Sequence, residues 1–359
     1  MAGVPPSAAL ASAAVLAPVA AFPLDAPLLL ATDCSGLGSP FLVLKRMGLF
    51  CRHIWASDSE KACRTMLRHH CAPELLFRSI EERSGQKMPQ PDLYVVGFPC
   101  QPFSGAGNRL GFDGEGGQIF FKVLETIRLT WPKVFLLENV DGLRSAAEGT
   151  CLDSIVESLL NLQIYNIYWQ SLNTKDHGIP HNRARIFFVG ILQIHDKGCF
   201  DFPAACRPVD IRQFLDIRQG RPSFADLPPE SATTARDNVT RILSEIEASG
   251  SDPFFDPWII DCDGSLGYAK AFPGVTPCIT RSRPNGHWVT SMGRRMTLPE
   301  ALRLQGFVED FENPVSERQL RMMLGSGMSL NVLERIFCSL LPAAGLSGPL
   351  RDPPHLQWT

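Results

Sequence analysis

The chain lacks several features that would assign it to a familiar class. Its 359 residues carry a net charge of −3, so it has no overall basic excess of the kind that many nucleic-acid-binding domains show. An anionic partner must therefore be bound by a local patch. None of the 11 cysteines belongs to a paired C-x-x-C motif, so the sequence indicates neither a zinc site nor a disulfide framework. Free thiols fit a reducing, intracellular compartment.

The two ends of the chain lack the marks of targeting and membrane segments. Residues 1–24 contain no charged side chain and are rich in Ala and Pro, so we expect a disordered leader. Secretory signals begin with basic residues and mitochondrial presequences contain Arg, and this segment has neither. Proline also interrupts its apolar run too often for the segment to span a bilayer. We expect residues 347–359 to be a loose tail. The sequence has no Lys/Arg cluster of the nuclear-import type, and a nucleus, a nucleoid and an organelle all stay possible as the location of the protein.

What the sequence does contain is an alternation of apolar runs with helical patterns. This alternation predicts a doubly wound, mostly parallel α/β sheet, because parallel strands need crossover helices and are buried on both faces. The composition, 45% hydrophobic and 20% charged, is sufficient for a substantial core. The runs that we interpret as strands are Leu28–Thr32, His53–Ser57, Leu93–Val96, Val134–Glu138 and Arg185–Leu192.

The stretch DLYVVGFPCQPFSGAG places a cysteine between two prolines directly after a predicted strand. Gly97 and Pro99 end that strand, so Cys100 falls in a loop at its carboxyl end. In open parallel sheets this edge is where ligands bind. A functional thiol is therefore favoured by position, whereas an ordinary buried cysteine is the alternative.

Two further strand ends carry polar side chains. The run PKVFLLENVDGL ends in Glu138 and Asn139, again at the carboxyl edge, and we expect this edge to neighbour Cys100. In DHGIPHNRARIFFVGI, Arg183 and Arg185 alternate at the start of a strand, which places both guanidinium groups on one face. Such a pair suits a phosphate or a carboxylate, although an exposed strand start would also explain it.

A glycine turn follows the first predicted strand. In TDCSGLGSPFLVLKRMG, Gly36 and Gly38 permit a tight turn before a helix, and a helix amino end suits a nucleotide-like ligand. Asp58 follows the second strand, where an acid can accept hydrogen bonds from ribose hydroxyls. Capping of the next helix is the alternative role for this aspartate.

These blocks, taken in order, resemble the cytosine-5 DNA methyltransferase family. The likeness covers Leu28–Ile191 and Arg294–Leu341, and its most specific part is Pro-Cys-Gln followed by Glu-Asn-Val 38 positions later (138 minus 100). The blocks that carry it are TDCSGLGSP, GFPCQPFSGAGNRLGF, LLENVDGL, DHGIPHNRARIFFVG, RRMTLPEALRLQGF and MLGSGMSLNVLERI.

The resemblance implies a covalent mechanism with S-adenosylmethionine as cofactor. Cys100 corresponds to the nucleophile that adds to carbon 6 of cytosine, because carbon 5 alone is too weak a nucleophile to attack a methyl donor. Glu138 corresponds to the acid that hydrogen-bonds the ring nitrogen and exocyclic amine, which requires a pKa raised by burial if it donates a proton. Arg183 corresponds to the arginine beside the pyrimidine carbonyl, and Arg185 supports the same cluster.

The resemblance also implies cofactor and substrate positions. Those for the cofactor are Cys34, Gly36, Gly38, Asp58, Ser79, Pro99 and Ser326, and those for the substrate are Gln101, Ser104 and Asn139. Three positions depart from the family pattern. Cys34 replaces an aromatic residue, Ser326 replaces an asparagine, and His181 replaces the glutamine that opens the arginine block. No metal is implied.

The resemblance further implies a division of labour along the chain. Residues 25–192 and 294–346 correspond to the catalytic domain, and 193–293 to a small, irregular target-recognition region in which Arg281 and Arg283 can contact phosphates or base edges. Solvated loop charges are the alternative for both. We expect a monomer that acts on double-stranded DNA and has no membrane partner. The alternatives are a tRNA cytosine-5 methyltransferase of the same superfamily and a catalytically weak DNA-binding regulatory homologue.

Overall fold

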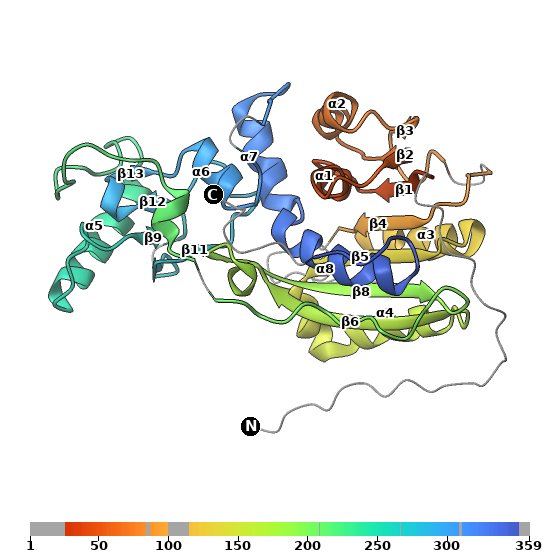
Figure 1. Cartoon of the computed structure of the whole chain (residues 1–359). Coiled ribbons are helices and arrows are strands. Elements are labelled where there is room, and N and C mark those ends of the chain that lie inside the picture. The colour runs from red at the N-terminus through yellow and green to blue at the C-terminus, as the bar shows by residue number, and fades with distance from the viewer. Residues whose placement is uncertain are drawn as a thin grey trace.

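A seven-stranded sheet organises the larger part of the molecule (Figure 1). The computed structural model describes residues 26–83, 87–99, 115–207, 209–265, 267–308 and 311–351. The strand order is β3-β2-β1-β4-β5-β8-β6. Pairing is parallel from β3 to β5, whereas β8 is antiparallel to both β5 and β6. The strands are β1 (Leu28–Asp33), β2 (Cys51–Ser57), β3 (Leu75–Phe77), β4 (Leu93–Gly97), β5 (Val134–Val140), β6 (Tyr165–Asn173) and β8 (Ala184–Leu192).

The predicted mostly parallel sheet is confirmed, and all five predicted strands are present. The sequence analysis missed β3 and β6, which are the two outer strands of the sheet. β3 is only three residues long, and β6 has polar residues at exposed positions, because an outer strand is less completely covered. In β6, polar residues alternate irregularly with aromatic ones, so the pattern does not stand out as a strand.

Helices cover both faces of the sheet and form two apolar layers. One layer contains residues of α1 (Ser39–Arg46), α2 (Lys61–His70) and α8 (Leu330–Ala343). The other contains residues of α3 (Glu115–Thr130) and α4 (Thr150–Leu160). Successive residues of β4 alternate between the two layers, which explains why its sequence is apolar throughout.

A smaller unit lies beside the sheet, on the left of Figure 1. It has a four-stranded sheet in the order β10-β9-β12-β13 and the helix α5 (Thr233–Ala248), which share a separate apolar core. Its strands are β9 (Trp258–Ile260), β10 (Ala271–Pro273), β12 (Trp288–Val289) and β13 (Arg294–Arg295). The unit corresponds in position to the predicted recognition region. The boundaries 193 and 293 stay predictions, and Phe200, Ile211 and Phe214 pack into the larger core.

Short elements connect the two units. The strand β11 (Thr276–Pro277) pairs in parallel with β7 (His181–Asn182), just before β8 begins. The helices α6 (Leu298–Arg303) and α7 (Glu317–Ser326) lead back from the small unit to α8. The start of β8 therefore meets the end of the predicted recognition region.

The predicted leader, residues 1–24, lies outside the described residues, as does the tail from residue 352 onward. Within the described ranges, no helix is both long enough and apolar enough to pass through a membrane.

A close approach in the centre of the sheet gives a first test of the fold. Gly190 of β8 pairs directly with Phe135 of β5, and a Cβ atom at residue 190 would lie 2.1 Å from the ring. Gly190→Ala should therefore reduce the free energy of unfolding by about 1–3 kcal/mol in urea denaturation, because a packed aromatic ring must move. In Phe135→Leu the same glycine substitution should cost clearly less. An equal cost in both backgrounds would contradict the packing described.

Candidate active site

The candidate active site lies where β4 and β5 end and β8 begins. Gly97 of β4 pairs with Glu138 of β5, so the strand leading to Cys100 and the strand that carries Glu138 are neighbours. Because β8 runs antiparallel, its first residues lie at this same edge, with Arg185 opposite Val140. Half-buried Pro99 is the last described residue before the loop. The predicted residues Cys100, Gln101 and Ser104 lie outside the described residues.

Glu138 is a buried acid beside a cation. Its side chain is 7% exposed, and its Oε1 atom lies 3.2 Å from Nε of Arg185. Burial raises the pKa of this carboxyl, while Arg185 and Arg183 act against the rise. The acid is therefore easier to protonate than an exposed glutamate, as a proton donor requires.

Arg183 holds together chain segments that are far apart in the sequence. Its guanidinium group is 1% exposed and donates to the carbonyls of Ile279 (3.0 Å), Gly325 (3.1 Å) and Gly327 (2.7 Å). It also donates to Sγ of Cys278 at 3.5 Å. These bonds fix the segments 278–279 and 325–327 at the start of β8.

The two arginines converge as the sequence analysis expected. Nη2 of Arg185 lies 3.8 Å from Sγ of Cys278, the same atom that Arg183 contacts. The sequence analysis missed Cys278, because its proximity to the arginines depends on the pairing of β11 with β7. No local motif in the sequence marks it.

His181 takes over the hydrogen bonds that an amide side chain could make. Its Nε2 atom accepts from the backbone N–H of Ile279 at 3.0 Å, and Nδ1 lies 3.1 Å from the carbonyl oxygen of Leu304. The imidazole is therefore neutral, with its proton on Nδ1. Burial, reinforced by the two neighbouring arginines, lowers the pKa of His181 well below its ordinary value. One donor and one acceptor are what a glutamine would supply, which accounts for this departure from the family pattern.

The glycine turn is tied to Asp58. Gly36 and Gly38 have φ angles of 52° and 75°, which favour glycine, and the backbone N–H of Gly36 donates to Oδ2 of Asp58 at 2.8 Å. Oδ1 of Asp58 accepts from the N–H of Glu60 at 2.9 Å, directly before α2. Burial raises the pKa of Asp58, and these two backbone bonds lower it. Asp58 thus supports both the turn and the next helix start; its predicted ribose contact stays a prediction.

An ion pair behind this turn escaped the sequence analysis. Asp33, fully buried at the end of β1, accepts hydrogen bonds from Ser57 (2.5 Å) and Tyr94 (2.6 Å) and pairs with Arg83. The guanidinium group of Arg83 also lies over the ring of Trp55, 4.4 Å from its centroid. Because each charge has polar partners, the pair can be buried and can fix the end of β1. In the sequence, the only sign of this ion pair is the acid Asp33 at the end of the apolar run LLLATD.

The three remaining cofactor candidates have different surroundings. Cys34 is half-buried with φ 49°, and burial raises the pKa of its thiol. Oγ of Ser79 accepts from the N–H of Glu82 at 3.2 Å. Ser326 is exposed, and its hydroxyl donates to Met322 within α7.

The segment around Ser326 contacts the glycine turn through neighbouring residues and not through the Ser326 side chain. The hydroxyl of Ser39 donates to the carbonyl of Met328 at 3.2 Å. A Cβ atom at Gly327 would lie 3.5 Å from Leu37. The carboxyl-terminal block is therefore joined to the turn without an asparagine at residue 326.

Asn139 and the two recognition arginines are engaged within the protein. Nδ2 of Asn139 donates to the carbonyl of Phe98 at 3.3 Å, which positions the backbone just before Pro99. Arg281 pairs with Glu60 at 2.6 Å, and Arg283 pairs with Asp261 at 3.2 Å. Arg281 therefore connects the recognition region to the residues beside the glycine turn.

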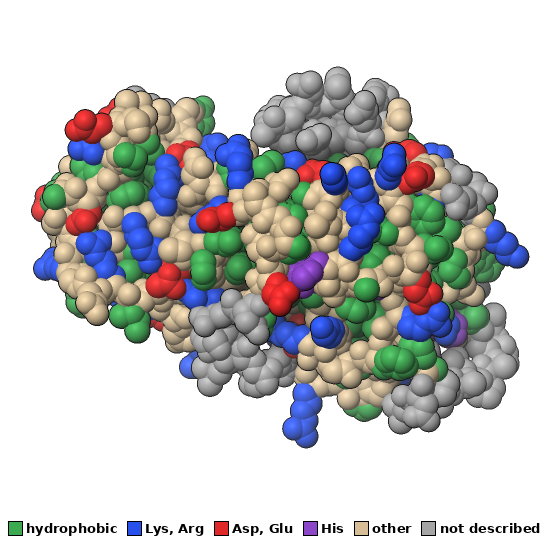
Figure 2. All heavy atoms as spheres, turned by 90° about the horizontal axis from the view of Figure 1, so that it is seen from above, with side chains coloured by type: hydrophobic (Ala, Val, Ile, Leu, Met, Phe, Trp, Pro, Cys, Tyr) green, Lys and Arg blue, Asp and Glu red, His purple; other side chains and the backbone are tan. Residues whose placement is uncertain are grey.

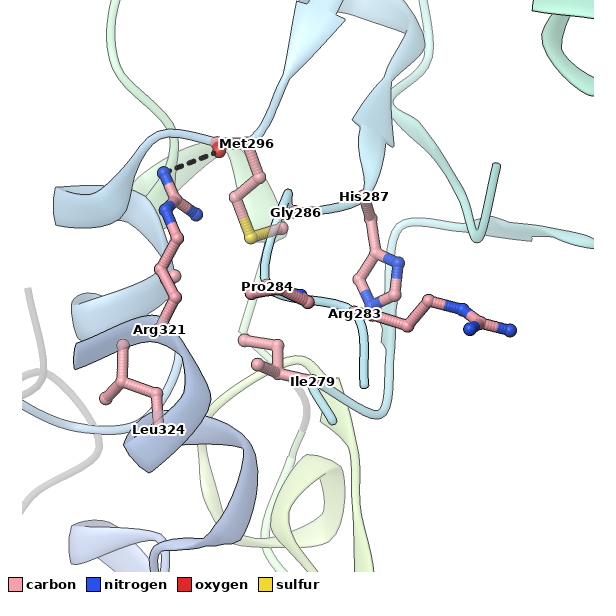
Figure 3. A pocket seen from close by; sticks show the side chains of 9 residues that line it. Ile279, Arg283, Pro284, Gly286, His287, Met296, Arg321 and Leu324 are labelled. Carbon is pink, nitrogen blue, oxygen red and sulfur yellow. Dashed lines mark hydrogen bonds between the residues drawn. The ribbon is translucent and has the colours of Figure 1, made fainter. Parts of the chain in front are cut away.

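A small pocket lies beside this segment (Figure 3). Arg321, from α7, donates to the carbonyl of Met296 on one side, while the Arg283 side chain extends away on the other. The pocket is lined by Ile279, Arg283, Pro284, Gly286, His287, Met296, Ala301, Arg321 and Leu324. It adjoins the candidate site through Ile279 but contains none of the predicted catalytic residues.

The surface and the potential metal ligands complete the description. On the face in Figure 2, Lys and Arg side chains are spread over both units and interspersed with Asp and Glu, in keeping with the near-neutral composition. No group of three or more His, Cys, Asp or Glu in the described part of the chain has an arrangement that could hold a metal ion.

The chain is similar in sequence to a characterised enzyme family. The profile of the family described as C-5 cytosine-specific DNA methylase matches residues 34–341. The type II methyltransferase M.NgoBI of Neisseria gonorrhoeae is 32% identical over 310 residues, covering 86% of this chain and 92% of that protein. The type II methyltransferase M.HaeII of Haemophilus aegyptius is 29% identical, with coverage of 87% and 92%.

Solved structures have a similar fold. A putative DNA modification methyltransferase encoded within an E. coli prophage matches with a TM-score of 0.58 and 18% identity, covering 89% of this chain and 98% of that one. The Dnmt2 methyltransferase of S. pombe matches with a TM-score of 0.57 and 17% identity, with coverage of 88% and 98%. At this level of identity the likeness concerns the fold.

The hydrogen bonds of His181 give a second prediction. His181→Gln should retain the fold, whereas His181→Leu should reduce the free energy of unfolding by roughly 2–4 kcal/mol, because it leaves Ile279 N–H and Leu304 carbonyl unpaired. Urea denaturation at pH 7.5 measures both. Equal stability of the two variants would show that these bonds contribute little.

The same histidine predicts a dependence of stability on pH. The unfolded chain takes up a proton at His181 near pH 6.5, whereas the folded protein does so only at lower pH. This contribution to stability is therefore complete above about pH 6.5 and is lost as the pH falls below it. His181→Gln should flatten this part of the stability profile in urea titrations between pH 7.5 and 5. An unchanged slope would mean that His181 takes up its proton at the same pH in the folded and the unfolded protein.

Proposed function

Because this chain belongs to the C-5 cytosine-specific DNA methylase family, we propose that the edge formed by β4, β5 and β8 is the site where it methylates cytosine. The resemblance drawn from the sequence is thereby confirmed: the protein is a DNA (cytosine-5)-methyltransferase related to type II methyltransferases. The observation that carries the proposed site is the buried Glu138 beside Arg185.

The proposed nucleophile is Cys100, since β4 leads directly to it. Addition of its thiolate to carbon 6 of cytosine places electron density on carbon 5. These atoms are inaccessible within a duplex, so the base must leave the stack at a cost of a few kcal/mol. After methylation, loss of the proton from carbon 5 expels the thiolate and restores the ring.

Glu138 and Arg185 are proposed to bind the base during this addition. A protonated Glu138 can donate to the ring nitrogen of cytosine, which stabilises the charge that develops there. We assign the contact with the pyrimidine carbonyl to Arg185, which the sequence analysis had given to Arg183. Two observations support giving this contact to Arg185. The Arg185 side chain adjoins Glu138 and is 14% exposed, whereas the Arg183 guanidinium group already donates to three backbone carbonyls.

The residues at the glycine turn fit S-adenosylmethionine, which supplies an electrophilic methyl group when bound. A Cβ atom at Gly36 would have nothing within 4 Å, so the turn borders open space at the carboxyl edge. We propose that Gly36, Gly38 and Asp58 hold the cofactor there, with Cys34, Ser79 and Pro99 around it. The contribution of Ser326 would come from its backbone, because its hydroxyl bonds within α7.

Double-stranded DNA is proposed to lie between the two units, where Arg281 and Arg283 can exchange their carboxylate partners for phosphates. Side-chain exposures of 43% and 32% allow such an exchange. A monomer in a reducing intracellular compartment stays our prediction.

Cys100→Ser tests the proposed nucleophile. The variant should lose methyl transfer but retain DNA binding, because a hydroxyl is a far poorer nucleophile than a thiolate at neutral pH. Duplex DNA with 5-fluorocytosine should form a covalent adduct with the wild-type protein only, as seen on denaturing gels. Appreciable turnover by the serine variant would overturn this assignment.

Matched variants test the assignment of the two arginines. Arg185→Gln should lower kcat by roughly 10²–10³-fold, the range for losing one positioned donor, with little change in stability. Arg183→Gln should instead lower the free energy of unfolding by more than about 2 kcal/mol, since it leaves several buried carbonyls unpaired. Single-turnover rates and urea denaturation of both proteins separate the effects. The reverse pattern would return the base contact to Arg183.

A further inference from the structure

Cys278 is held between two cations at the edge of the candidate site. Its Sγ atom lies 3.5 Å from Nη1 of Arg183 and 3.8 Å from Nη2 of Arg185. The residue directly follows β11 and is half-buried.

The electrostatic surroundings of Cys278 differ from those of other cysteines in the described ranges. Burial opposes its ionisation, but Arg183 and Arg185 outweigh burial and lower the pKa of the thiol below its ordinary value. Burial instead raises the pKa of several other thiols, so they stay protonated at neutral pH. These are Cys34, Cys51, Cys63, Cys71, Cys151 and Cys262.

A second observation indicates that the cluster around Cys278 receives a polar ligand. Nε of Arg183 is buried and has no hydrogen-bond partner among the described residues. A buried polar atom is costly when unpaired, so this nitrogen favours a polar group that enters the cluster from outside. Cys278 therefore belongs to a site that is open to ligands.

We propose that Cys278 is a modification site, where reaction with a low-molecular-weight disulfide reversibly stops methyl transfer. The thiolate attacks one sulfur of RS–SR, a bond forms between Sγ and that sulfur, and the original S–S bond breaks. The second half leaves as RS⁻ with the electron pair and takes a proton from solvent, while the proton of Cys278 has gone to solvent. Cys278 is oxidised, and half of the disulfide is reduced.

The consequence for activity follows from the contacts of Sγ. The mixed disulfide can no longer ionise, so it cannot pair with the two arginines as a thiolate, and it adds bulk next to them. Arg183 joins the segments 278–279 and 325–327, and Arg185 adjoins Glu138, so the modification disturbs the base-binding group. This inference rests on the proposed function because it assumes that Arg185 and Glu138 bind the base.

The modification itself can be measured independently of methyl transfer. The Cys100→Ser protein is incubated with 2-hydroxyethyl disulfide at pH 6.5, and adducts are located by peptide mass spectrometry over time. Cys278 should react at least several-fold faster than Cys199, an exposed cysteine that serves as an internal reference. Equal or slower reaction of Cys278 would overturn the proposal, whatever the role of Cys100.

The effect on activity is tested with matched substitutions. Wild type, Cys278→Ser, Cys278→Ala and Cys199→Ser are treated with the same disulfide, and methyl transfer is expressed relative to each protein's own starting rate. Inactivation should be slower in both Cys278 variants, unchanged in Cys199→Ser, and reversed by dithiothreitol. Inactivation of the Cys278 variants at the wild-type rate would show that modification of Cys278 does not stop methyl transfer. An active Cys100→Ser enzyme would refute the proposed nucleophile but leave the mapping result valid.

Discussion

The arrangement of the site depends on one buried cation. Arg183 is almost completely excluded from solvent, and a buried guanidinium group is tolerated only when acceptors surround it. It finds them in the carbonyls of Ile279, Gly325 and Gly327 and in the thiol of Cys278. These acceptors come from two segments, 278–279 and 325–327, that are far apart in the sequence. Satisfying this charge therefore brings the end of the recognition region and the carboxyl-terminal block to the start of β8. His181 strengthens the same junction, because it binds both Ile279 and Leu304 as a neutral imidazole.

The antiparallel direction of β8 places its first residues at the proposed active site. If β8 were parallel to β5, its first residues would lie at the opposite edge of the sheet, far from Glu138. In the antiparallel arrangement Arg185 lies beside Glu138. Burial raises the pKa of Glu138 and so favours the protonated acid, whereas Arg185 limits this rise. On the other side of β4, the pair of Asp33 and Arg83 fixes the end of β1, from which the glycine turn starts. Two buried charge clusters thus lie at the two halves of the proposed site, one proposed for the base and one for the cofactor.

The sequence was sufficient to predict the central strands and several residues at their ends. Strands β1, β2, β4, β5 and β8 are buried on both faces and therefore have apolar runs, after which Asp58 and Glu138 stand out as polar residues. The outer strand β3 was missed because it has only three residues, and β6 was missed because exposed polar residues interrupt its apolar pattern. The partners of Arg183, the Asp33–Arg83 pair and the position of Cys278 could not be predicted, since each depends on contacts between distant segments. The proposed exchange of roles between Arg183 and Arg185 has the same cause. Both arginines share the alternation in the sequence, and only the carbonyls around Arg183 distinguish them.

The central claim is that this edge of the sheet transfers a methyl group to carbon 5 of cytosine in DNA. It is tested most directly by incubating the full chain with S-adenosylmethionine labelled in its methyl group and with either duplex DNA or tRNA, followed by nucleoside analysis. The account predicts label in 5-methylcytosine of the duplex DNA and none above background in tRNA, with Glu138→Gln strongly reduced. Label in tRNA alone would contradict the DNA substrate, and label in neither, despite measurable DNA binding, would indicate a regulatory homologue.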